Sequence, residues 1–237
     1  GYLGSKLNEA LKQKNFNITC IDNYLYGNSR IIGKSKNQSK IIKKDIRDLS
    51  FSFLEKFDAI YCLASLSNNP IKKINQKKIY DISKNYTTKL ADQVEKIGNK
   101  LIFPSSCSVY GKIDSEKVAN ERTTSNPLTY YSINKHEIEN YLINKSKKNN
   151  NFNCTILRTA TVFGSSPSMR FDIVINMLIG MSITYRKILL NSDGSAYRPF
   201  IYIDDLINFF ILSLDLKENF LVLNAGFNSY NYSIKSI

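Results

Sequence analysis

The stretch that decides the fold is Lys100-Leu-Ile-Phe-Pro-Ser-Ser-Cys-Ser-Val-Tyr-Gly111, an apolar run that ends in a cluster of small hydroxyl residues. A short apolar run of this kind predicts a buried strand, which we expect over residues 101–104. In a parallel sheet, ligands bind at the carboxyl ends of the strands. Hydroxyl groups just after Phe103 should therefore point into a crevice, and Ser106 becomes a candidate site residue.

Short apolar runs and amphipathic helices alternate along most of the chain. We expect strands at residues 17–21, 41–44, 59–63, 101–104 and 154–157, and helices at residues 5–13, 80–97 and 130–146. Strand–helix–strand units with right-handed crossovers build a doubly wound parallel sheet that has helices on both faces. We therefore predict an α/β domain over residues 1–163 and a smaller, interwoven α/β part over residues 164–237, where the pattern loosens.

Tyr131-Ser-Ile-Asn-Lys135 places a tyrosine and a lysine four residues apart on the last of these helices, and therefore on one face. A protonated Lys135 beside the Tyr131 phenol favours the phenolate and should lower the pKa of Tyr131 toward working pH. Tyr131 is then a candidate general base. The alternative reading of such a pair is an exposed lysine beside a half-buried tyrosine.

The strand, the serine cluster, Val109-Tyr-Gly111 and the Tyr131/Lys135 helix follow one another in an order that resembles the extended short-chain dehydrogenase/reductase family. The resemblance is to its NAD-dependent epimerase/dehydratase branch and extends over nearly the whole chain. It implies a Rossmann domain, NAD as the cofactor and a nucleotide-diphosphate sugar as the substrate. We also expect a homodimer.

Gly1-Tyr-Leu-Gly4 looks like the second half of a glycine fingerprint that enters a helix. Glycines there let the backbone approach a pyrophosphate, and the helix amino end supplies free N–H groups. Asp22 lies about twenty residues further on, where a carboxylate binds the adenine ribose and favours NAD over NADP, although Asp22 alone also reads as a turn cap. The resemblance implies further cofactor contacts from Tyr2, Leu3, Asn23, Asp45, Ile46, Leu63, Ala64, Ser65, Asn85, Tyr131 and Lys135.

The family places a first strand and a first glycine before the position of Gly1. We therefore expect the chain to begin inside the first strand–helix turn and to be a fragment at both ends. The first strand of a doubly wound sheet is paired on both sides, so we expect a chain that lacks it to bind NAD poorly.

The resemblance implies an epimerase in which NAD takes a hydride from a sugar carbon while Tyr131 removes the proton of the attached hydroxyl. Ser106 would stabilise the oxygen, and Lys135 would bind the nicotinamide ribose. Dehydratases of the family carry an Asp-Glu pair directly after this serine, but Cys107-Ser108 stands here. We therefore expect epimerisation rather than dehydration.

For the substrate, the resemblance implies that Arg198 holds the diphosphate, because a guanidinium suits phosphate oxygens. Thr161, where many epimerases carry Asn, and Asn176 are further substrate candidates. Two alternatives stay open. The same residues would serve an NAD(P)-dependent reductase of a keto-sugar or another carbonyl compound, and the chain could also be a non-catalytic dinucleotide-binding protein.

Composition limits the remaining classes of function. The net charge is +13, but the lysines are interleaved with Asn and Ile along the chain, so we expect no nucleic-acid partner. No apolar run approaches the roughly 20 residues of a membrane span, so we expect no membrane partner. The four cysteines are scattered without metal-ligand spacing, which predicts buried reduced thiols, no metal and a cytoplasmic protein.

Overall fold

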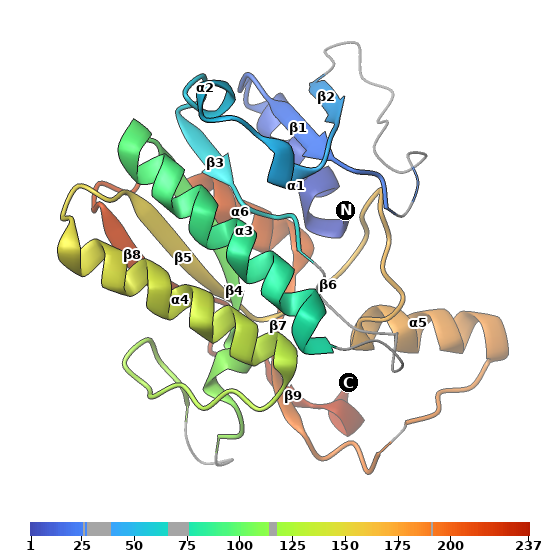
Figure 1. Ribbon diagram of the computed structural model, residues 1–237. Helices are drawn as coiled ribbons and strands as arrows, with labels where there is room; N and C mark the ends of the chain where they lie inside the picture. Colours follow the sequence, from blue (N-terminus) through green and yellow to red (C-terminus); the bar gives the residue numbers. More distant parts are fainter. Residues whose placement is uncertain (26, 28–38, 66–75, 114–117, 191) are drawn as a thin grey trace.

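The structure is a computed structural model that describes residues 1–25, 27, 39–65, 76–113, 118–190 and 192–237 (Figure 1). Its centre is a sheet of four parallel strands in the order β3-β4-β5-β8. These strands are β3 (Ala59–Tyr61), β4 (Lys100–Ser106), β5 (Cys154–Thr159) and β8 (Phe220–Ala225). The two middle strands are buried along almost their whole length, as the apolar runs predict.

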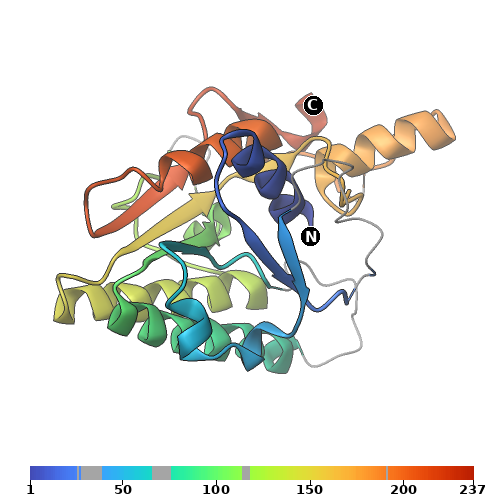
Figure 2. The ribbon, with the colours of Figure 1, turned by 90° about the horizontal axis from the view of Figure 1, so that it is seen from above.

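Two helix pairs cover the two faces of this sheet, and Figure 2 shows the sheet between them. On one face lie α1 (Tyr2–Gln13) and α6 (Ile203–Leu212); on the other lie α3 (Gln76–Ile97) and α4 (Tyr130–Lys148). Consecutive strand residues alternate between two cores. Ile102 packs in the core with α1 and α6, whereas Phe103 packs in the core with α3 and α4.

Two smaller sheets and several short elements accompany the central sheet. β1 (Thr19–Asp22) and β2 (Lys40–Lys43) form a separate parallel pair. β6 (Thr161–Phe163), β7 (Tyr197–Tyr202) and β9 (Asn231–Ser233) form a small mixed sheet. The short elements are η1 (Ile46–Asp48), α2 (Phe51–Leu54), η2 (Cys107–Tyr110) and η3 (Ile234–Ser236), while α5 (Val174–Tyr185) projects from the body (Figure 1).

The predicted α/β class is confirmed, with parallel strands and helices on both faces of the central sheet. All five expected strands and all three expected helices are present, with ends that shift by a few residues. One difference concerns continuity: in the described part of the chain β1 and β2 pair only with each other, so the expected single sheet is two ladders.

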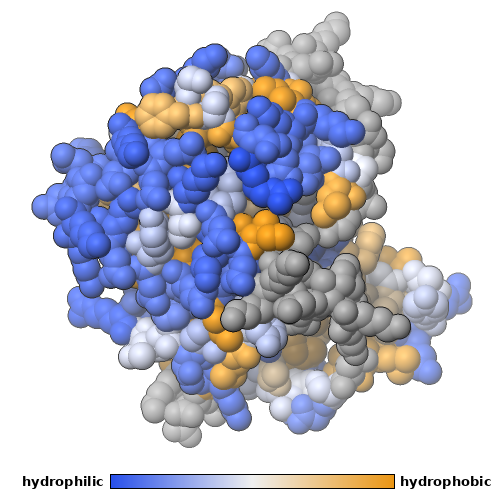
Figure 3. All heavy atoms as spheres, viewed as in Figure 1, coloured by the Kyte–Doolittle hydropathy of each residue, from blue (hydrophilic) through white to orange (hydrophobic). Residues whose placement is uncertain are grey.

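The division into residues 1–163 and 164–237, with interwoven parts, stays a prediction. β8 and α6 come from the second part, yet β8 pairs with β5 and α6 packs against α1. The outer face formed by α3 and α4 is mostly hydrophilic (Figure 3). It carries inter-helix ion pairs such as Lys84 with Glu137 and Lys145 with Glu95.

Candidate active site

A crevice opens at the carboxyl ends of β1, β3, β4 and β5, as part of a continuous cavity of about 2900 Å³ that also reaches residues at the amino ends of the central strands, such as Asp58 and Lys100. Most of the residues expected to bind cofactor or substrate line it. They are Gly1, Tyr2, Leu3, Gly4, Asp22, Asn23, Asp45, Ile46, Leu63, Ala64, Ser65, Ser106, Tyr131, Lys135, Thr161 and Arg198. The loops after parallel strands meet at one edge of the sheet, which explains why residues so distant in sequence converge here.

Ser106 is the last residue of β4 and the N-cap of η2. Its Oγ accepts hydrogen bonds from Ser108 N at 3.2 Å and from Ser108 Oγ at 2.9 Å. The turn closes at Gly111, whose φ of 71° favours glycine. A Cβ there would also collide with the carbonyl oxygen of Asn126. The strand and this turn together hold Ser106 at the floor of the crevice.

Tyr131 and Lys135 lie in the first turns of α4. A capping box fixes the start of this helix: Thr129 Oγ1 accepts from Ser132 N at 3.1 Å, and Ser132 Oγ accepts from Thr129 N at 2.9 Å. The Tyr131 ring meets Tyr80 of α3 edge to face, with 6.1 Å between the ring centroids. The helix start therefore holds the phenol over the end of β4.

Lys135 is 5% exposed, and its ammonium group points toward the sheet. Nζ donates a hydrogen bond to the carbonyl oxygen of Pro104 at 2.7 Å and lies 4.6 Å from the centroid of the Phe103 ring. Nζ is 5.8 Å from the centroid of the Tyr131 ring. Burial lowers the pKa of Lys135 to about 8, against the opposing effect of nearby Cys62 and Glu139.

The expectation that Lys135 lowers the pKa of Tyr131 is wrong for this arrangement. Burial raises the pKa of Tyr131 to about 12, and the side-chain hydrogen bond with Ser106 opposes the increase only in part. The physical reason is desolvation, which disfavours the phenolate, together with an ammonium group that is directed at Pro104. Tyr131 therefore holds its proton at neutral pH in this structure.

The start of α1 fits the pyrophosphate of a dinucleotide. No side chain caps this helix, and no acidic residue lies in its first turn, so its first N–H groups stay available to an anion. A Cβ at Gly1 would meet nothing within 4 Å, and one at Gly4 would reach Leu63 Cδ1 at 3.6 Å. The side chain of Tyr2 points elsewhere, since its hydroxyl donates to Gly164 O at 2.8 Å.

Asp22 lies beside the glycine turn, with Oδ2 3.5 Å from the amino group of Gly1. Its Oδ1 accepts from Tyr24 N at 2.8 Å, so the turn-capping reading of Asp22 is also realised. Both carboxylate oxygens of Asp45 accept hydrogen bonds from the Arg47 guanidinium, and Asp45 also caps η1. The Arg47 hydrogen bonds lower the pKa of Asp45 to about 2, so this carboxylate is ionised at neutral pH.

The structure does not bring two of the expected residues to the crevice. Asn176 is 3% exposed and is used to hold the chain: Oδ1 accepts from Gly164 N at 3.0 Å, while Nδ2 donates to Arg170 O at 2.9 Å and to Tyr2 Oη at 3.3 Å. Both amide protons are engaged within the protein in this structure, and the substrate contact of Asn176 stays a prediction. Asn85 is exposed on α3 and does not line the crevice, because its helix turns the side chain outward.

Two crevice residues were not anticipated as site residues. Arg170 is paired with Asp172 at 2.6 Å and lies close enough to Tyr131 that each affects the pKa of the other. Cys107 is next to Ser106, and burial raises the pKa of its thiol to about 11. Arg170 belongs to no spacing pattern, so only the folded chain reveals its proximity to Tyr131, whereas the place of Cys107 follows from its position directly after Ser106.

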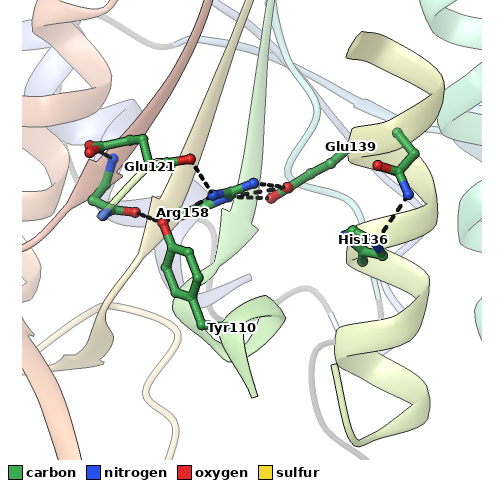
Figure 4. Close-up of polar contacts among 7 residues, drawn as sticks. Tyr110, Glu121, His136, Glu139 and Arg158 are labelled. Carbon is green, nitrogen blue, oxygen red and sulfur yellow. Dashed lines mark hydrogen bonds and ion pairs between the residues drawn. The ribbon is translucent and has the colours of Figure 1, made fainter. Parts of the chain in front are cut away.

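A buried polar network lies behind η2 (Figure 4). Arg158 of β5 donates to both carboxylate oxygens of Glu139 on α4, from Nε at 3.2 and 3.1 Å and from Nη2 at 2.7 Å. Its Nη1 donates to Tyr110 Oη at 3.0 Å, and Tyr110 Oη donates to Asn224 Oδ1 at 2.6 Å. The network links four elements: η2, α4, β5 and β8. Helical spacing from Tyr131 and Lys135 to Glu139 is the sequence signal that could have found it.

The comparison with protein families agrees with this geometry. Residues 1–226 match the model of the NAD dependent epimerase/dehydratase family. The chain belongs to this family. The match covers the elements from α1 to β8.

Relatives within the family differ in their reactions. A UDP-N-acetyl-alpha-D-glucosaminuronate decarboxylase of Bacillus cytotoxicus is 25% identical, over 95% of this chain and 72% of its own length. UDP-arabinose 4-epimerase 1 of Arabidopsis thaliana is 22% identical, over 90% of this chain and 58% of its own length. The chain thus spans little more than half of that epimerase.

Solved structures share the fold. The UDP-glucuronic acid 4-epimerase from Bacillus cereus, in complex with NAD, superimposes with a TM-score of 0.81 at 27% identity, over the full length of this chain and 77% of that one. An NAD-dependent NDP-hexosamine 5,6-dehydratase involved in tunicamycin biosynthesis superimposes with a TM-score of 0.84 at 21% identity, over 100% of this chain and 76% of that one.

None of the described helices is long and apolar enough to cross a membrane.

Proposed function

We propose that this protein is a nucleotide-sugar epimerase in which Tyr131 exchanges the proton of a sugar hydroxyl. The observation that carries the proposal is the convergence of Ser106, Tyr131 and Lys135 in the crevice, with the Ser106 side chain close enough to the Tyr131 phenol to lower its pKa. A serine that bonds the reacting oxygen and a phenol that moves its proton are the acid–base pair that such a reaction needs.

NAD fits the cradle formed by Gly1, Gly4 and Asp22, with Lys135 near the reacting end. When bound, NAD supplies a hydride acceptor and donor. The residues of this chain then do the remaining work: α1 binds the pyrophosphate, Asp22 binds the adenine ribose, and Ser106 orients the hydroxyl. The proton of that hydroxyl passes to Tyr131 once the phenol is ionised, so the reaction requires a phenolate that the buried site disfavours in this structure. A nucleotide-diphosphate sugar fits because Arg198 is exposed at the crevice beside Thr161 and can meet phosphate oxygens.

Epimerisation is favoured over elimination of water because Cys107 and Ser108 follow Ser106. A Cys107 thiol whose pKa is raised to about 11 is a weak acid and supplies no carboxylate to remove a carbon-bound proton. One observation favours the keto-sugar reductase as the second candidate. The raised pKa of Tyr131 keeps its phenol protonated, which suits proton donation to a carbonyl oxygen.

The test combines Tyr131→Phe with product analysis. The protein is incubated with NAD and a panel of nucleotide sugars, and the products are identified by NMR. We expect a changed configuration with no net redox, and a loss of turnover of about 10²- to 10⁴-fold in Tyr131→Phe. The matched control is Tyr130→Phe, which alters the adjacent, half-exposed tyrosine. Stoichiometric consumption of NADH or NADPH with a keto-sugar would establish the reductase instead.

A further inference from the structure

We propose that Tyr110 is a positioning residue for Ser106: through the buried pair Arg158–Glu139 it ties the turn that carries Ser106 to the helix that carries Tyr131. The inference rests on the proposed function, in which Ser106 and Tyr131 act on the same oxygen. It assigns a role to the network behind η2 that the acid–base chemistry itself does not use.

The serine turn, which runs from Ser106 to Tyr110 and contains η2, is short and held at both ends. Ser106 caps its beginning, and Tyr110 is its last residue, 5% exposed. Between them the Ser106 Oγ accepts hydrogen bonds from Ser108 N and Oγ, within the turn, and it lies near the Tyr131 phenol. A rotation of the turn about the end of β4 would therefore move Ser106 relative to Tyr131, unless the Tyr110 end is held.

Three contacts hold the Tyr110 end. Its hydroxyl accepts from Arg158 Nη1 at 3.0 Å and donates to Asn224 Oδ1 at 2.6 Å, so both hydrogen-bonding functions of the phenol are engaged. The Arg158 guanidinium carbon also lies 5.0 Å from the centroid of the Tyr110 ring. Asn224 is held in turn, because its N–H donates to Glu121 Oε1 at 2.7 Å. Figure 4 shows Tyr110 directed at the guanidinium from below.

Arg158 connects Tyr110 to α4. Its partner Glu139 lies eight residues after Tyr131 and four after Lys135, so all three side chains lie along one face of the helix. Glu139 is therefore about 12 Å along the helix axis from Tyr131, at a rise of about 1.5 Å per residue. The serine turn and α4 thus contact each other at two places. Ser106 lies near Tyr131 at one, and Tyr110 is linked through Arg158 to Glu139 at the other.

A buried network can simply stabilise a core, and Tyr110→Phe distinguishes this from positioning. The substitution removes one oxygen and leaves the ring over Arg158. We expect kcat to fall about 10- to 100-fold with little change in KM, since a displacement of about 1 Å at reacting atoms costs about that much. If Tyr110 acts through Ser106, Tyr110→Phe should cause no further loss in a Ser106→Ala background. Tyr141→Phe is the control, because this α4 residue is exposed and its hydroxyl donates to Asp92 of α3, away from the network.

A second readout needs no substrate. The NMR resonance of Tyr131 Cζ, in protein labelled with 13C at that position of tyrosine, reports the surroundings of the phenol, including the nearby Ser106 hydroxyl. It should shift in Tyr110→Phe and in Asn224→Leu, which removes the acceptor at the other side of the Tyr110 hydroxyl, but not in Tyr141→Phe. Unmoved Tyr131 resonances in both variants, or fully additive losses with Ser106→Ala, would overturn the proposal. A wild-type protein without turnover would instead refute the proposed function, and the resonances would still decide the positioning.

Discussion

Replacing Glu139 by Gln should destabilise the protein far more than its small chemical change suggests. The Glu139 and Arg158 side chains are 1% and 6% exposed, and three donor–acceptor contacts join them at 2.7–3.2 Å. Glutamine keeps the shape but removes the negative charge, so the guanidinium becomes a buried cation without compensation. Breaking a buried pair in this way costs about 3–5 kcal/mol.

The expected loss is large beside a total unfolding free energy of about 5–15 kcal/mol for a domain. With a urea m-value of about 2 kcal/mol/M, a loss of about 4 kcal/mol lowers the urea midpoint by about 2 M. Circular dichroism at 222 nm, recorded while urea is added, follows the loss of the helices. The m-value of the resulting unfolding curve also reports any change in the unfolded state.

The matched control lies two residues earlier on the same helix. Glu137 Oε2 is 2.7 Å from Lys84 Nζ, but these side chains are 46% and 31% exposed. Glu137→Gln should therefore cost about 0–1 kcal/mol, and about 1 M salt should remove even that. The double variant Glu139→Leu with Arg158→Met should recover most of the stability, since it removes both buried charges. Equal, small losses in Glu139→Gln and Glu137→Gln would refute the reasoning.

Two further predictions concern the cofactor side of the crevice. Lys135 should titrate with a pKa of about 8 in a 13Cε NMR experiment, and the free energy of unfolding should rise between pH about 8 and the ordinary lysine value of 10.5, because the folded state loses this proton first. Lys135→Met should abolish that rise, and a titration midpoint of Lys135 near pH 10.5 would contradict the burial argument. Asp22→Ala should weaken NAD binding and relax discrimination against NADP in calorimetric titrations, because it removes the carboxylate beside the glycine turn. Equal affinities for NAD and NADP in the unmodified protein would contradict this role of Asp22.

Much of the fold follows from local patterns in the sequence. The apolar run before Ser106 predicts a buried strand, and β4 is buried from Lys100 to Ser105. The spacing of Tyr131 and Lys135 predicts one helix face, and both lie on α4 in the crevice. Such patterns succeed because strand and helix periodicity depends on neighbours within a few residues along the chain.

Side-chain roles, in contrast, were decided by contacts between distant parts of the chain. Asn176 reads as a substrate contact in the sequence, but Gly164 N and Tyr2 Oη occupy its amide. The pKa of Tyr131 was expected to fall and is raised to about 12, because desolvation depends on every group packed around the phenol. The sequence alone thus predicted β1 to β5, the helices α1, α3 and α4, and the face that carries Tyr131 and Lys135, but not β8, the fourth strand of the central sheet. Only the tertiary structure decided protonation and hydrogen-bond partners, since both depend on burial by residues far away in sequence.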